Sequence, residues 1–317
     1  MTTTAVDRPV ATPPVRPRRR RTRLPRFALA VPSWTWYLLY FLVPLGVIVV
    51  YSFGYKRAFG TERAGTIGLD RLSLQNYRDS LSGTFLSTFR STFVVALTGT
   101  VLLLLIAFPL AYFMATRVSP RWRGLLLGLV IVPFWTSFLL RTFAWRIILS
   151  PNGYVSTKLQ DIGVLNSPIE LLDTRAAVQL GIVYNYLPLM VFPLFVALDR
   201  LDPALREASK DLGAGRVKTF FSVTLPLAMP GIVAGVLLAF IPLMGEYVTP
   251  EVLGGAKGLM AGSLVASQFL EAQNWALGSA MAVVLIGLTL ATIAVLALAA
   301  WLTGTLLRRR RAVVLPV

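Results

Sequence analysis

Long apolar runs are the feature that most limits what this chain can fold into. Its 317 residues are 56% hydrophobic and 14% charged. Six runs reach the length of about 20 residues at which a helix crosses the hydrocarbon core of a bilayer. Their approximate bounds are 28–53, 91–115, 124–148, 175–198, 228–249 and 279–306. Prolines inside several runs predict helix kinks. The sequence therefore predicts an all-α, polytopic membrane protein with six transmembrane helices.

The charged segments outside these runs predict the orientation. Residues 1–26 are rich in proline, contain the run Arg18–Arg21 and show no hydrophobic period, which indicates a disordered basic arm. Six spans place both termini on one side, and 20 of the 31 Lys and Arg residues fall on that side. Because positive charge collects in cytoplasmic segments, we expect both termini to be cytoplasmic. The predicted parts are the cytoplasmic arm (1–26), a six-span domain (27–307) that includes a cytoplasmic loop (199–226), and a cytoplasmic tail (308–317).

The composition also excludes several kinds of chemistry. The chain has no Cys and no His, so it lacks a thiolate nucleophile, an imidazole base and the commonest metal ligand. Gly213–Thr219 has the wrong spacing for a phosphate-binding loop. We therefore expect no catalytic residue, no metal and no cofactor bound by this chain. The formal charge of +17 is mostly explained by insertion and by contact with anionic lipid, so we expect no nucleic-acid partner.

The loop at 199–226 is a polar connector between two apolar runs. Asp202 is a good N-cap residue, Pro203 suits the first helical position, and Gly213 suits the left-handed position that follows a helix end. These residues predict a short helix. A second short helix is expected from about Arg216 to Val223, before a proline opens the next span. A charged connector of this kind offers a docking site for a soluble partner.

The order of residues in this connector resembles the coupling loop of the binding-protein-dependent (MetI-like) permeases of ABC importers. An acidic residue and small residues are followed by a glycine six positions after the acid and then by a Leu-Pro pair, with Ser209 in place of the second alanine. In that family the loop docks into a cytoplasmic ATPase. The resemblance implies that five residues couple ATP hydrolysis to transport: Glu207, Ala208, Gly213, Leu225 and Pro226.

A member of that family does not act alone. The resemblance implies the transmembrane fold of type I ABC importers, located in the bacterial plasma (inner) membrane. It further implies a homologous second permease, a dimeric ABC ATPase and an extracytoplasmic solute-binding protein as partners. ATP and Mg would be bound by the partner ATPase and not by this chain.

Three other stretches resemble the spermidine/putrescine permeases within this family. They are Arg141–Trp145 with Asn152-Gly153, Gly181–Pro188, and Met244–Pro250 with Leu253–Lys257. Gly262-Ser263 departs from the resemblance, because Gly-Asn is expected there. The resemblance implies a polyamine as solute. Permeases for iron, thiamine, phosphonate and opines share the coupling loop and remain alternatives. Outside the family, a self-contained secondary transporter and a membrane scaffold without a solute are the alternatives, and the docking loop argues against the former.

A carboxylate near the outer end of the fifth run is the candidate substrate group. Glu246 follows Pro242 and Gly245, which should interrupt the helix and turn backbone carbonyls toward a cavity. An ionisable group in a span indicates a function by default, and its partner is either a transported cation or a protein cation such as Arg141 or Arg146. The two arginines could instead repel cations or extend toward the headgroups.

Aromatic side chains close to these positions could offer π faces to ammonium groups. Ordinary packing between helices is the alternative for each of them. We expect the substrate pathway to combine Glu246 with four aromatic residues: Tyr247, Tyr184, Tyr186 and Trp135.

Overall fold

A computed structural model describes residues 26–57, 67–164, 166–168 and 170–312. Apart from Arg26, the predicted basic arm lies outside the described residues, as does the end of the predicted tail. The chain divides into two compact units, Met1–Val47 and Ile48–Val317, and each is described by itself.

The first unit contains most of one apolar helical segment. Helix α1 (Arg26–Tyr37) passes through a π-helical turn, η1 (Leu38–Leu42), into α2 (Val43–Ser52). The stretch Ala30–Ser52 is long and apolar enough to cross a membrane. It corresponds to the first predicted run.

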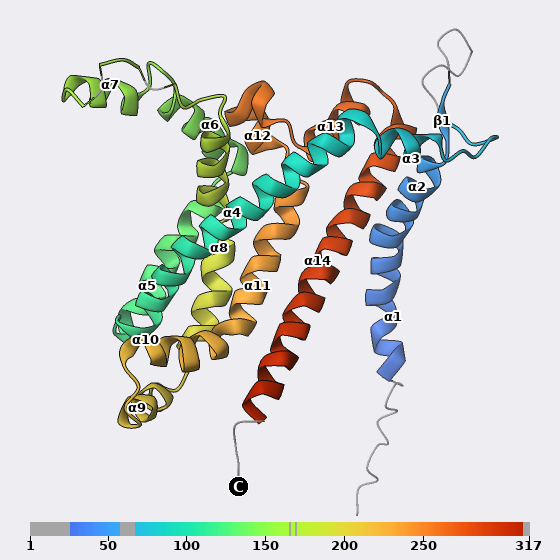
Figure 1. Cartoon of the computed structure of the whole chain (residues 1–317). Coiled ribbons are helices and arrows are strands. Elements are labelled where there is room, and N and C mark those ends of the chain that lie inside the picture. The colour runs from blue at the N-terminus through green and yellow to red at the C-terminus, as the bar shows by residue number, and fades with distance from the viewer. Residues whose placement is uncertain (1–25, 58–66, 165, 169, 313–317) are drawn as a thin grey trace, which may run out of the picture. The chain divides into compact units, whose positions relative to one another are not determined.

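The second unit contains four further continuous segments that could cross a membrane. Helices α4 (Gly83–Thr116), α8 (Arg175–Asp199) and α14 (Trp275–Ala312) are three of them (Figure 1). Helix α14 extends beyond the predicted end of its span and includes the first residues of the predicted tail. With the segment described next, these helices match four of the predicted runs.

The fourth segment is longer than the sequence predicted. Helix α10 (Arg216–Thr219), a π-helical turn η3 (Phe220–Thr224) and α11 (Leu225–Met244) form one helical stretch of 29 residues. The prediction of a separate short helix ending before the proline is wrong. A π turn is one of the local adjustments by which a helix accommodates a proline, and here it lies directly before the first turn of α11.

The third predicted run is broken rather than merely kinked. Helix α5 (Pro120–Ile131) and a 3-10 turn, η2 (Val132–Trp135), meet α6 (Phe138–Ile148) at an angle of 88°. Pro133 cannot donate a backbone hydrogen bond, and Thr136 is extended, so the helical hydrogen bonds stop here. If this bent pair counts as one span, the described residues contain up to six spans. The predicted fold class is thereby confirmed.

The core of the second unit lies along α8, which packs against both α4 and α11. Small residues on α11 allow this close packing. A Cβ atom at Gly231 would lie 2.8 Å from the backbone oxygen of Pro193, and one at Gly235 would lie 2.8 Å from the sulfur of Met190. Close approach through small residues is the usual way in which membrane helices associate.

The remaining elements of the second unit gather at two opposite ends (Figure 1). We call one the α9 end, which carries α9 (Pro203–Asp211) and α10. The other is the α12 end, and α10–η3–α11 separates the two by about 43 Å at 1.5 Å per residue. The α12 end carries α3 (Gln75–Ser80), α7 (Tyr154–Asp161), α12 (Val248–Gly254), the 3-10 turn η4 (Gly255–Gly258), α13 (Ala261–Leu270) and the antiparallel strands β1 (Tyr55–Lys56) and β2 (Ile67–Gly68).

Candidate functional site

The predicted coupling helix forms at the α9 end. Asp202 caps α9 by accepting a hydrogen bond from the backbone N–H of Ala204 at 2.9 Å, and Pro203 occupies the first turn. Gly213 follows the helix with a φ of +79°, a left-handed conformation that is strained for a residue with a Cβ atom. Its N–H donates to Lys210 O, and the next N–H donates to Ser209 O, which is the Schellman arrangement. The sequence signals for this helix are confirmed.

Two polar contacts hold the α9 end together. The hydroxyl groups of Ser209 and the buried Thr219 lie 3.1 Å apart and join α9 to α10. An alanine at position 209 could not make this bond. Arg123 forms an ion pair with Asp199 at 2.5 Å and thereby links the start of α5 to the end of α8. We call residues 202–219, which these contacts position, the coupling segment.

The coupling segment presents both charge and apolar surface. Glu207 is exposed and lines a cavity of about 380 Å³ that is otherwise rich in basic side chains. Leu212 is 89% exposed and Val217 is also exposed, although both are apolar. The sequence prediction missed these two residues, and their signal was an apolar side chain in a polar connector. Exposed apolar groups of this kind mark interaction surfaces when they gather on one segment.

The remaining predicted coupling residues divide between two elements. Ala208 lies on α9 and is exposed, like Glu207. Leu225 and Pro226 lie in the first turn of α11, within the membrane-spanning stretch. Leu225 and Pro226 thus lie at the base of the span, whereas Glu207 and Ala208 lie on α9 and Gly213 follows its end.

Glu246 lies just beyond the end of α11, in the short link to α12. The helix ends at Met244, as Pro242 and Gly245 led us to expect, so Glu246 is outside the span helix and not inside it. Its side chain is only 6% exposed. One carboxylate oxygen accepts hydrogen bonds from the N–H groups of Val248 at 2.9 Å and Thr249 at 3.1 Å, which caps α12. The other accepts from the hydroxyl of Tyr186.

The alternative partner for Glu246, an ion pair with Arg141 or Arg146, is not formed in this structure. Among the described residues, no salt bridge includes Glu246. Arg146 instead donates to the backbone oxygen of Val252 at 2.5 Å. Arg141 is 7% exposed and therefore does not extend to headgroups. Its guanidinium lies 5.3 Å from the ring centre of Phe134, and its Nε and Nη1 atoms have no hydrogen-bond partner in the described part of the chain.

Two buried polar residues that the sequence prediction did not single out lie beside these groups. Asn185 is buried on α8, and its amide nitrogen donates to Thr142 on α6 at 3.2 Å. The Oδ1 atom of Asn185 has no partner in the described part of the chain. The signal in the sequence was an amide side chain within an apolar run. We call these residues, with those just described, the Glu246 cluster: Glu246, Tyr186, Asn185, Thr142 and Arg141.

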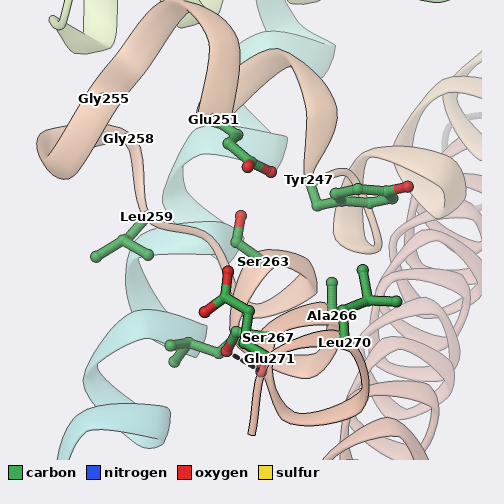
Figure 2. A pocket seen from close by; sticks show the side chains of 11 residues that line it. Tyr247, Glu251, Gly255, Gly258, Leu259, Ser263, Ala266, Ser267, Leu270 and Glu271 are labelled. Atoms are coloured by element: carbon green, nitrogen blue, oxygen red, sulfur yellow. Dashed lines mark hydrogen bonds between the residues drawn. The ribbon is translucent and has the colours of Figure 1, made fainter.

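The four predicted aromatic residues do not converge on one point. Tyr186 belongs to the Glu246 cluster. Tyr184 packs edge to face against Trp145, with ring centres 5.4 Å apart. Trp135 is 82% exposed at the bend between α5 and α6. Tyr247 lies beside a separate cavity between α12 and α13 (Figure 2). Only Tyr186 contacts Glu246 directly through a side-chain hydrogen bond among the described residues.

Comparison with known proteins identifies the family. Residues 107–312 match the family described as the binding-protein-dependent transport system inner membrane component. The chain belongs to this family. It is 38% identical to the spermidine/putrescine transport system permease protein PotB of Haemophilus influenzae, over 81% of this chain and 86% of the relative. It is 39% identical to PotB of Escherichia coli K12, over 67% of this chain and 77% of the relative.

Solved structures support the same fold. The chain is similar in structure to a chain of a bacterial ABC transporter involved in the import of the acidic polysaccharide alginate. That match has a TM-score of 0.61 at 20% identity and covers 90% of this chain and 94% of the other. The same kind of transporter, in complex with an alginate-bound periplasmic protein, matches with a TM-score of 0.65 at 16% identity, over 84% and 90% of the two chains. The chain is a permease subunit of an ABC importer.

Proposed function

We propose that this permease forms half of the translocation pathway of a polyamine importer, with spermidine or putrescine as the solute. The identity of 38–40% with spermidine/putrescine permeases over most of the chain supports this substrate class. The observation that carries the proposal is Glu246, a buried carboxylate at the end of a span that has hydrogen-bond donors but no ion pair among the described residues.

Glu246 has no counter-charge among the described residues. A carboxylate removed from water loses several kcal/mol of solvation even after the protein relaxes. Hydrogen bonds from Tyr186 and two backbone N–H groups offset part of this cost but leave the net charge in place. An ammonium group of the solute supplies the opposite charge. The faces of Tyr186 and Tyr247 add cation–π attraction along the same path.

The coupling segment is the docking site for the partner ATPase, which binds ATP and Mg. In this mechanism, ATP binding draws two ATPase subunits together, and α9 moves with them. The permease and its homologous partner then change from inward-facing to outward-facing to accept the solute, and hydrolysis resets them. Glu207, Ala208 and Gly213 transmit this motion, while Leu225 and Pro226 connect it to α11. The exposed Leu212 and Val217 add apolar contact with the ATPase.

This assignment orients the chain in a bacterial plasma membrane. The α9 end and both termini face the cytoplasm, and the α12 end meets an extracytoplasmic solute-binding protein. The excess of Lys and Arg on the side of the coupling segment supports this orientation.

The testing experiment is the ATPase activity of the complete complex in lipid, with both permeases, the ATPase and the binding protein. Spermidine, putrescine and unrelated solutes are added in turn. We expect stimulation by the polyamines. Stimulation by iron, thiamine, a phosphonate or an opine instead would retain the coupling mechanism and discard the polyamine. Uptake by this chain alone, driven by an ion gradient, would discard the ABC mechanism.

A further inference from the structure

A second cavity lies at the α12 end, apart from the Glu246 cluster. It is about 380 Å³ in volume, is partly open to solvent and is lined by residues of α12, η4 and α13 (Figure 2). Its polar lining comes from three parts of the chain. Glu251 and Tyr247 lie at α12, Ser263 and Ser267 lie on α13, and Glu271 follows α13 directly. The function proposed above uses only Tyr247 from this set.

The polar groups of this cavity differ in their partners, because the hydroxyl of Ser267 donates to the backbone oxygen of Leu264 at 2.9 Å while the exposed carboxylates of Glu251 and Glu271 remain open to a ligand. Neither the carboxylate of Glu251 nor that of Glu271 has an ion pair or a side-chain hydrogen bond in the described part of the chain. The hydroxyl oxygen of Ser263 is buried and also has no partner there. Figure 2 shows this hydroxyl between the two carboxylates, which approach it from opposite sides. A buried hydroxyl without a partner costs free energy, so any group that forms a hydrogen bond with it would be stabilised at this position.

The charge and shape of the lining select the class of ligand. The side chains offer two carboxylates, two serine hydroxyl groups and one tyrosine, and they include no basic residue. A hard divalent cation takes six or more oxygen ligands, usually with several carboxylates. No group of three or more His, Cys, Asp and Glu residues in the described part of the chain could hold a metal ion. The cavity therefore fits an organic cation with two separated ammonium groups.

From this arrangement we infer that the cavity is an outer receiving site for a di- or polyammonium solute, an inference that rests on the proposed function. One ammonium group binds Glu251 and another binds Glu271, while the ring of Tyr247 faces the alkyl chain or an ammonium group. The Ser263 hydroxyl accepts a hydrogen bond between them. Ser263 is also the residue at which the sequence departs from the Gly-Asn expected in polyamine permeases.

The cavity is connected to Glu246 by direct backbone packing. A Cβ atom at Gly262 would lie 2.6 Å from the backbone oxygen of Gly245 and 2.9 Å from that of Glu246. The start of α13 therefore rests against the link that holds Glu246, and Tyr247 is the residue next to Glu246. The cavity and the link that carries Glu246 are therefore neighbours at the α12 end.

The test uses the complete complex in lipid with its binding protein, and the variants are Glu251→Gln, Glu271→Gln and the double substitution. The readout is the concentration of spermidine or putrescine that gives half-maximal ATPase stimulation and uptake. Since both carboxylates are exposed and exposed charge pairs contribute modestly, we expect a rise of about threefold for each single variant and roughly tenfold for the pair. Glu170→Gln, an exposed glutamate before α8 and outside this cavity, is the matched control and should have no effect.

Further measurements on the same complex distinguish failure of the receiving site from failure of the proposed function. If the unaltered complex shows no polyamine stimulation, the proposed function fails. If it is stimulated normally but the double variant keeps the same half-maximal concentration, the receiving site fails while the function stands. The double variant Glu251→Asp with Glu271→Asp should recover much of the affinity, because it restores both charges. If the double variant changes only the concentration of binding protein that the complex requires, the carboxylates act in docking of that protein and the receiving site is refuted. If millimolar Ca²⁺ occupies the cavity as effectively as spermidine does, the inference of an organic ligand is refuted.

Discussion

Glu246→Gln separates a transport role for the carboxylate from a structural one. Glutamine has nearly the same shape, and its oxygen can accept from the N–H groups of Val248 and Thr249 while its amide donates to the Tyr186 oxygen. The substitution therefore keeps the positions of the three hydrogen bonds, reverses the direction of the one with Tyr186 and removes the charge. The contrasting variant Tyr186→Phe separates the effect of that bond from the effect of the charge.

The expected change in stability is small because two effects oppose each other. Hydrogen bonds to charged groups contribute about 1.5–3 kcal/mol, against about 0.5–1.5 kcal/mol for neutral ones, so neutralising three bonds costs roughly 3 kcal/mol. Removing an unpaired buried charge also removes its desolvation penalty of several kcal/mol. The melting temperature should consequently stay within a few degrees of the parent or rise. Transport should fall about a hundredfold, since a lost buried charge partner costs roughly 3 kcal/mol.

Two measurements on the same preparation test this reasoning. Thermal unfolding of the complex in lipid nanodiscs gives stability, and polyamine uptake into proteoliposomes gives transport per folded permease. Tyr186→Phe serves as the contrasting variant, because it keeps the charge and removes one donor, which should destabilise by about 1–3 kcal/mol. A Glu246→Gln complex that melts much earlier yet transports normally per folded molecule would refute a substrate role for the charge.

Three further substitutions test other steps of the argument. Glu207→Lys should leave insertion and polyamine binding intact while uptake falls several-fold, and unchanged uptake in proteoliposomes would sink the coupling role. Gly213→Ala should destabilise the end of α9 by about 1 kcal/mol, because position 213 has a positive φ. The loss should be measured as faster amide hydrogen exchange at the end of α9. Gly215→Ala is the control and should have no such effect, because Gly215 has a φ of −63° and open space around it. Gly262→Ala should displace the link that carries Glu246 and lower both the melting temperature and the uptake. Gly287→Ala, where a Cβ atom would meet nothing within 4 Å, should stabilise the protein or be neutral. Equal effects of the two substitutions would contradict close packing at Gly262.

The sequence by itself determined the membrane class, the approximate spans and the coupling helix. Span positions follow from the length of apolar runs, which depends only on the transfer of side chains from water to lipid. The limits of α9 follow from local backbone chemistry, since Asp202, Pro203 and Gly213 act within one turn of their own positions. Features that arise within a few residues of chain can be predicted from those residues.

Only the tertiary structure decided which polar groups meet. Glu246 bonds to Tyr186, which is 60 residues away along the chain, and not to either arginine that the sequence suggested. Arg141 lies between aromatic rings rather than at the headgroups, and α12 and α13 bring Glu251 and Glu271 to one cavity. Arg141 follows the 88° break between α5 and α6, and close packing at Gly262 sets the start of α13 against the link that carries Glu246. The free energy of each contact depends on two groups that are distant in sequence, so no local pattern of residues predicts the contact.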